Sequence, residues 1–261
     1  GQAVFAVFAL LCALVLPPAY LADPFCCFAF LPLGAKHALP LFDAAHYLLL
    51  SAALSAAAWL LSRPQRGGAG RAAGAVVLAI ALALADAAWR GVLWPSENAA
   101  RWLHPVLLLA PFVFAARYLR WRGAQYLLLA AALFYAALLL PENFRAAPFA
   151  AWGILAAHTA LAAWLLSDKQ EDAGGFPAAV HAAALLLFGL LWQKLVFQTA
   201  SLWLGGVWLQ LTWLAVPAAY LLLSAKARPA LFARHPAAYR TFGGTACALA
   251  AAAWLLWANF S

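Results

Sequence analysis

Long hydrophobic runs separated by short polar segments fill almost the whole chain. Within the runs, as at residues 127–133, apolar residues lack the alternation with polar residues that a transmembrane β-barrel strand requires. Each run is close to the about 20 residues that a helix needs to cross a hydrocarbon core of about 30 Å. The pattern predicts about nine transmembrane helices, at residues 3–20, 43–62, 72–90, 102–117, 125–140, 148–166, 177–192, 201–223 and 241–258.

Backbone polar groups in lipid must be satisfied within each helix, so we expect an all-α, polytopic transmembrane bundle. It would form a single integral membrane domain over residues 1–261. Residues 24–42 depart from the pattern, because three prolines, one glycine and Lys36 interrupt them. Their uninterrupted part is too short to cross, which predicts a re-entrant or interfacial segment, with a distorted tenth helix as the alternative.

Composition strengthens the membrane prediction. Hydrophobic residues make up 68% of the 261 positions and charged residues 9%, whereas soluble domains average about 25% charged residues. A net charge of +8 is explained by basic loops at a membrane surface, so we expect the lipid bilayer and other membrane proteins as partners, and no nucleic acid. Methionine is absent even at position 1, which indicates a processed start or a piece of a longer chain.

The basic residues indicate an orientation. If the predicted helices cross in succession, eleven of the sixteen lysines and arginines fall on one side. These are Arg63, Arg66, Arg71, Arg117, Arg120, Arg122, Lys169, Lys226, Arg228, Arg234 and Arg240. Cytoplasmic loops carry an excess of lysine and arginine, so we expect these loops and the N-terminus in the cytoplasm and the C-terminus outside.

Asp86 and Arg90 are ionisable residues inside a predicted helix. A charged side chain at the bilayer centre costs about 2.5–3.5 kcal/mol, so such residues are functional candidates. The two residues are four positions apart and share a helix face, where they can pair. We expect a neutralising pair near the interface, with an ion or proton site as the alternative.

His158 lies in the middle of the predicted helix 148–166. We expect a neutral imidazole that is hydrogen-bonded to another helix, with a proton relay or a haem ligand as the alternative. Haem requires a second ligand at matching depth, and His46, His104 and His181 lie closer to helix ends. We therefore expect no cofactor.

A polar patch marks the C-terminal third and comprises Gln193, Lys194, Gln198, Gln210 and Thr212. Buried amides and hydroxyls often join transmembrane helices. The same residues could instead line a polar cavity, in which Lys194 would bind an anionic headgroup or substrate.

Motifs of known catalytic chemistry are missing. The sequence has no HExxH, phosphate-binding loop, GxSxG or DxD-type cluster, so we expect no catalytic and no metal site. Asp43 and His46 fall in the first turn of a predicted helix, where Asp43 is expected to be the N-cap, with an Asp–His dyad as the alternative. Glu97 and Glu142 lie in predicted external loops and are the candidates for a metal-free membrane transferase.

Four features of residues 177–261 are distinctive when taken together. They are a helix with His181 and Trp192, a helix with Trp208 and Pro217, the segment HPAAYR from His235 to Arg240, and the ending from Trp254 to Asn259. In these features the chain resembles the bacterial predicted-membrane-protein family known as domain of unknown function 2339, to which residues 1–20 are also similar. The resemblance implies a longer chain with more crossings, and no activity or catalytic residue.

We therefore expect a non-enzymatic, multi-pass protein of the bacterial inner membrane, acting as a scaffold or as a subunit of an envelope assembly or transport system. Two alternatives stay open. One is a transporter or a lipid- or polyprenol-handling protein with a cavity near His158, Asp86 and Lys194. The other is a membrane-embedded transferase that uses Glu97 or Glu142.

Overall fold

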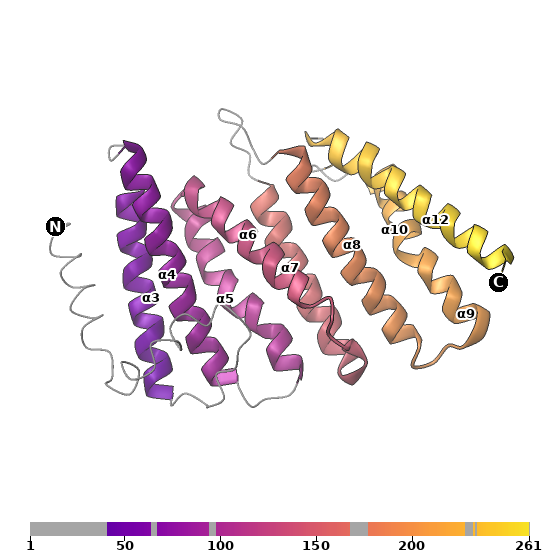
Figure 1. Ribbon diagram of the computed structural model, residues 1–261, viewed down its shortest axis with the longest axis horizontal. Helices are drawn as coiled ribbons and strands as arrows, with labels where there is room; N and C mark the ends of the chain where they lie inside the picture. The colour runs from indigo at the N-terminus through magenta and orange to yellow at the C-terminus, as the bar shows by residue number, and fades with distance from the viewer. Residues whose placement is uncertain are drawn as a thin grey trace. The chain divides into compact units, whose positions relative to one another are not determined.

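The computed structural model describes residues 41–63, 67–93, 98–167, 177–227, 232 and 234–260. Figure 1 shows that the regular structure in these segments is helical. Contacts divide the chain into two compact units, residues 1–130 and 131–261, and the division falls within α6 (Arg122–Leu138). The predicted helix at 3–20 and nearly all of the predicted re-entrant segment at 24–42 lie outside the described residues.

The first unit contains α3 (Leu41–Leu61), α4 (Gly67–Leu93) and α5 (Asn98–Tyr118) besides the start of α6. Small residues let the backbones of α3 and α4 approach closely, and the two helices lie side by side (Figure 1). Ala58 on α3 is fully buried, and a Cβ atom at Gly74 on α4 would lie 2.8 Å from the Ala58 carbonyl oxygen. Glycine is therefore required at this contact.

Larger side chains complete the interface between α3 and α4. Tyr47, Leu50 and Leu84 belong to one buried hydrophobic cluster. Beside this cluster, Ser51 Oγ donates a hydrogen bond of 2.6 Å to the carbonyl oxygen of Ala81. No water competes for such a hydroxyl inside a membrane, so the bond fixes the position of one helix along the other.

The second unit contains α7 (Pro148–Leu166), α8 (Ala178–Ala200) and two helical segments in which the helix type changes. The first segment comprises α9 (Gly206–Leu211), a 3-10 turn at Thr212–Leu214, α10 (Ala215–Leu222) and a π-helical turn at Leu223–Ala227. The second segment comprises a π-helical turn at Ala237–Phe242 and α12 (Gly243–Phe260). Helix α8 contacts α7, α10 and α12, and α10 also contacts α12.

Six helices in the described part of the chain are long and apolar enough to cross a membrane. They cover Ala44–Leu61, Gly67–Arg90, Pro148–Leu166, Ala178–Ala200, Gly206–Ala225 and Ala237–Ala258. Two shorter apolar helices, Trp102–Tyr118 and Gly123–Leu138, coincide with two further predicted spans. The all-helical prediction is confirmed for the described residues, whereas the count of about nine crossings is not.

Several helix boundaries differ from the predicted ones, and two of the differences concern candidate residues. Helix α8 continues to Ala200 instead of ending at residue 192, so Lys194 lies within the helix. The break comes at residues 201–205, ahead of Gly206, whose φ of +54° is readily adopted only by glycine. Helix α3 begins at Leu41, so Asp43 lies inside it and is not its N-cap. The side chain of Asp43, and with it the Asp–His dyad, lies outside the described residues.

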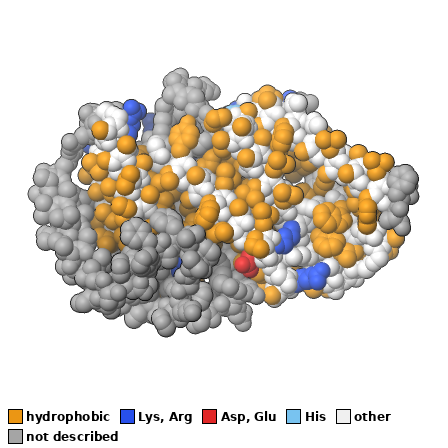
Figure 2. Space-filling view, in the orientation of Figure 1, with side chains coloured by type: hydrophobic (Ala, Val, Ile, Leu, Met, Phe, Trp, Pro, Cys, Tyr) orange, Lys and Arg blue, Asp and Glu red, His pale blue; other side chains and the backbone are white. Residues whose placement is uncertain are grey.

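The candidate membrane helices differ in how much of their length is buried, and the two least buried ones lie in the second unit. Gly67–Arg90 in the first unit is 44% buried, whereas Gly206–Ala225 and Ala237–Ala258 in the second are each 6% buried. Figure 2 shows hydrophobic side chains over much of the described surface on the face drawn, with only a few lysines and arginines. Such a surface is suited to lipid or to an apolar protein surface rather than to water.

Candidate functional site

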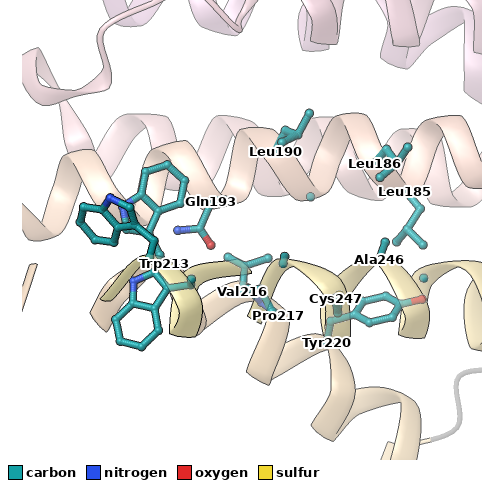
Figure 3. A pocket seen from close by; sticks show the side chains of 15 residues that line it. Leu185, Leu186, Leu190, Gln193, Trp213, Val216, Pro217, Tyr220, Ala246 and Cys247 are labelled. Atoms are coloured by element: carbon teal, nitrogen blue, oxygen red, sulfur yellow. The ribbon is translucent and has the colours of Figure 1, made fainter. Parts of the chain in front are cut away.

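A groove in the second unit lies between α8, α10 and α12 (Figure 3). Its volume of about 530 Å³ falls within the about 300–1,000 Å³ that small-molecule sites occupy. Leu186 and Leu190 line it from α8, Val216 from α10, and Ala246 and Ala250 from α12. The groove is half open, and its lining contains no charged residue. Its chemistry therefore favours an apolar ligand.

Small side chains keep the groove unfilled. Gly189 on α8 lines it, and no atom lies within 4 Å of the position that a Cβ atom would take there. Ala246 and Ala250 face the same space from α12 with a single methyl group each. Because leucine at these positions would occupy the space, the residue types themselves create the cavity.

Gln193 places an unsatisfied acceptor at the wall of the groove. The residue is 8% exposed, and its Nε2 donates to the carbonyl oxygen of Thr212 at 3.0 Å. Gln193 Oε1 is shielded from solvent and has no hydrogen-bond partner among the described residues. Figure 3 shows this carboxamide between α8 and the helix that carries Val216. An unsatisfied buried acceptor costs about 1–3 kcal/mol, so a donor that reached this oxygen would be stabilised.

Tyr220 lies at the other end of the groove (Figure 3), and Gly243, which also lines the groove, lies next to it. A Cβ atom at Gly243 would lie 2.6 Å from Leu185 Cδ2 and 2.8 Å from Tyr220 Cζ. Glycine therefore lets α12 come against both α8 and α10 at this point. The hydroxyl of Tyr220 already has an acceptor, because Tyr220 Oη donates a hydrogen bond of 2.6 Å to the carbonyl oxygen of Tyr239.

Two histidines and Tyr239 form a cluster next to Tyr220. His181 and Tyr239 are both buried, and His181 Nδ1 lies 3.0 Å from Tyr239 Oη. The rings of His181 and His235 stack with their centroids 3.9 Å apart. Tyr239 belongs to the π-helical turn Ala237–Phe242, and π turns are frequent at functional sites. Sequence reasoning named His181 and the HPAAYR segment, but it did not predict that they meet.

In the first unit, Asp86 and Arg90 form the predicted pair, and His104 joins it. Arg90 Nε lies 2.8 Å from Asp86 Oδ2, and His104 Nε2 lies 3.0 Å from Asp86 Oδ1. Asp86 is 5% exposed and His104 is 7% exposed. One buried carboxylate thus links α4 to α5. The sequence carried no signal for His104 as a partner, because the contact depends on how two helices pack.

His158 is hydrogen-bonded to another helix, as predicted. It is fully buried in α7, and its Nε2 lies 3.0 Å from the carbonyl oxygen of Ala132 on α6. Phe188 on α8 packs edge-on against its ring, with the two centroids 5.7 Å apart. The imidazole therefore joins three helices of the second unit, and it does not line the groove.

Lys194 and Gln198 bind the segment that connects α6 to α7. Lys194 Nζ donates to the carbonyl oxygen of Leu140 and lies 5.2 Å from the centroid of the Phe144 ring. Gln198 Oε1 accepts a hydrogen bond of 2.7 Å from Phe144 N. These contacts hold the 3-10 turn at Phe144–Ala146 against α8. Neither side chain lines the groove.

The remaining candidates do not gather at one place. Gln210 contacts α12 through its backbone, because its carbonyl oxygen accepts a hydrogen bond of 3.0 Å from Trp254 Nε1. Glu142 lies close enough to Lys194 to attract it electrostatically, and Glu97 lies outside the described residues. Within the segments that are described, no three histidine, cysteine, aspartate or glutamate side chains could hold a metal ion.

No family model, curated protein or solved structure matches the sequence. The structure alone therefore indicates the class of protein. Its described residues are helical and include six helices that are able to cross a membrane, and its second unit has an apolar groove. The resemblance of residues 177–261 to the bacterial family of unknown function stays a prediction.

Proposed function

We propose that the protein crosses the bacterial cytoplasmic membrane about nine times and acts there without enzymatic activity, as a scaffold or as a subunit of an envelope assembly or transport system. This proposal is based on the contacts that the ionisable residues make with neighbouring helices and segments. Asp86 on α4 contacts both Arg90 on the same helix and His104 on α5. His158 and Lys194 bind backbone carbonyl oxygens of neighbouring segments. Groups engaged in this way stabilise helix contacts.

These contacts favour the scaffold over the two alternatives. A transporter would need its ionisable residues to line a passage, but His158 and Lys194 point to backbone oxygens outside the groove. A transferase would need two titratable groups positioned on a substrate. Glu142 instead lies near the cation of Lys194, which also binds Leu140.

The second unit also supports an orientation. The end of α8 at Ala200, the start of α9 at Gly206 and the C-terminal end of α12 lie together in Figure 1. This end is rich in tryptophan and carries Trp203, Trp208, Trp254 and Trp257. The other end carries Arg234 and Arg240. Tryptophan settles at membrane interfaces and basic residues accumulate in the cytoplasm, so we place the arginine end inside and the tryptophan end outside.

The experiment measures whether other proteins cover the outward face of α12. Leu249 and Leu256 are 65% and 62% exposed and lie seven residues apart on one helix. The full chain, tagged and expressed at low level, is extracted into lipid nanodiscs and its mass and composition are determined. Fluid lipid accommodates a tryptophan at either leucine, whereas a packed protein contact does not.

For a subunit, the chain is recovered with a second membrane protein at fixed stoichiometry, and the double substitution Leu249→Trp and Leu256→Trp abolishes that recovery. The matched control is Leu49→Trp on α3, where the leucine is 72% exposed in the first unit, and it keeps the partner. Recovery of the chain with lipid alone, in the wild type and in both variants, would overturn the proposal.

A further inference from the structure

The groove of the second unit joins two features that occur together in ligand sites: an apolar cavity and one polar group without a partner. The cavity measures about 530 Å³ and lies on helices that are able to cross a membrane. The polar group is Gln193 Oε1, on a residue that is more than nine-tenths buried. An amide oxygen only accepts hydrogen bonds, so the missing partner is a donor.

None of the described residues donates a hydrogen bond to Gln193 Oε1. Gln193 Nε2 is held by the Thr212 carbonyl oxygen, which fixes the orientation of the carboxamide. Trp254 Nε1 donates to Gln210, and Tyr220 Oη donates to Tyr239. These two donors that border the cavity thus have their acceptors elsewhere, and a bound molecule with a donor could supply the partner that Gln193 Oε1 lacks among the described residues.

We propose that the groove binds the chain of a membrane-dissolved long-chain alcohol, whose hydroxyl donates a hydrogen bond to Gln193 Oε1. This site goes beyond the proposed scaffold function and does not depend on it. Gln193 lines the cavity, and its carboxamide lies at the cavity wall (Figure 3). The apolar chain then lies between Leu186 and Leu190 on one side and Val216 on the other, and runs toward Tyr220.

The lining selects a neutral hydroxyl over a charged headgroup. A carboxylate or phosphate only accepts hydrogen bonds when ionised, so it repels the Gln193 oxygen. An ammonium group would lose its hydration, and the lining contains no acidic residue to compensate. A hydroxyl gives up little hydration and supplies the donor that the site lacks.

The depth of Gln193 agrees with this ligand. Seven residues separate it from the end of α8 at Ala200, which corresponds to about 10 Å along the helix axis. The hydroxyl would thus lie below the tryptophan-rich end of the unit, and its chain would point further into the bilayer. At the far end of the groove, the contact of Gly243 with Tyr220 and Leu185 limits how far the chain extends.

The test uses the full chain in nanodiscs and a photoreactive, diazirine-bearing hexadecanol, compared with its methyl ether. The ether has the same chain but no donor. Labelling of α8, α10 and α12 peptides is quantified by mass spectrometry. We expect the alcohol to label them about fivefold more than the ether, the factor that one hydrogen bond gives. Substitution Gln193→Leu should abolish this preference while both probes still label the groove.

A second pair of variants tests the cavity. Gly189→Leu fills the groove, and Gly153→Leu is its matched control, since Gly153 on α7 also has open space around its missing Cβ atom but does not line the groove. Gly189→Leu should abolish labelling by both probes, whereas Gly153→Leu should leave it unchanged. A melting temperature measured for each variant confirms that it is folded.

Equal labelling by alcohol and ether in the wild type would overturn the hydroxyl assignment. Labelling that survives Gly189→Leu, or that is absent from the groove peptides of the wild type, would overturn the site. Neither result would contradict the proposed scaffold function. That function is tested separately, by whether a second membrane protein is recovered with the chain and whether substitutions on the outward face of α12 abolish this recovery.

Discussion

The α3–α4 pair of the first unit and the α8–α10–α12 group of the second show two outcomes of packing apolar helices. In the first, Ala58 and Gly74 bring the backbones together, and the Ser51 hydroxyl bonds across the contact. In the second, small residues face one another across a gap of about 530 Å³. Ala44–Leu61 and Gly67–Arg90 are 28% and 44% buried, whereas Ala178–Ala200 is 33% buried and Gly206–Ala225 and Ala237–Ala258 are each 6% buried.

The difference lies in what the small residues face. Gly74 faces the backbone of the neighbouring helix, so its missing side chain closes the contact. Gly189 faces open space, so its missing side chain enlarges a cavity. The same residue type therefore stabilises one interface and opens the other. The polar groups of the two units differ in the same way. In the first unit both carboxylate oxygens of Asp86 are paired, whereas in the second unit Gln193 Oε1 has no partner among the described residues.

The largest effect is expected when the polar contact of the first unit is removed. Asp86→Leu leaves the Arg90 guanidinium and His104 without their carboxylate in an apolar region. We expect the free energy of unfolding in detergent to fall by about 3 kcal/mol, the loss typical of breaking a buried pair by removing one partner. Chemical unfolding followed by circular dichroism measures it. An unchanged unfolding midpoint would show that the pair does not hold α4 to α5.

A smaller loss is expected when the close helix contact is forced apart. Gly74→Leu places a side chain against the Ala58 carbonyl oxygen, and overpacking of this kind costs about 1–3 kcal/mol. Gly68→Leu is the control, because Gly68 on the same helix has no neighbouring atom within 4 Å of a Cβ position. The midpoint of thermal unfolding should fall for Gly74→Leu alone. If the midpoint fell by a similar amount in both variants, the cause would be the leucine side chain on α4 and not the close contact with Ala58.

The smallest effect is expected at the groove. Gln193→Leu removes an unsatisfied acceptor, and the Thr212 carbonyl oxygen keeps the backbone N–H of Ala215 as a donor. The free energy of unfolding should therefore change by less than about 1 kcal/mol. Gln198→Leu on the same helix leaves Phe144 N without its acceptor and should cost about 1–2 kcal/mol. Equal losses in the two variants would contradict the contrast between the two glutamines.

The sequence predicted those features that depend on one helix at a time. Helical content followed from the length of the apolar runs, and the Asp86–Arg90 pair followed from a spacing of four. The contact of His104 with Asp86, and of His181 with Tyr239, required knowledge of helix packing. Helix α8 is apolar around almost its whole circumference, so its sequence does not indicate which face meets protein and which meets lipid. The sequence therefore named Gln193 as a residue that could line a cavity, but it predicted neither the apolar lining of the groove nor the place of Gly189 in it.

The π-helical turn at Ala237–Phe242 makes the groove depend on how the chain is wound as well as on the identity of its residues. A π turn holds one residue more than the α turn it replaces, and one residue rotates an α-helix by about 100°. Because the π turn takes up this residue, the residues after it keep the orientation that they would have without it. If the same residues were wound as an α-helix, α12 would rotate relative to the buried Tyr239, and Cys247 and Trp254, which line the groove, would turn away from it. The cavity thus depends on the winding of this turn, and α-helical winding would remove the cavity even though every lining residue is kept.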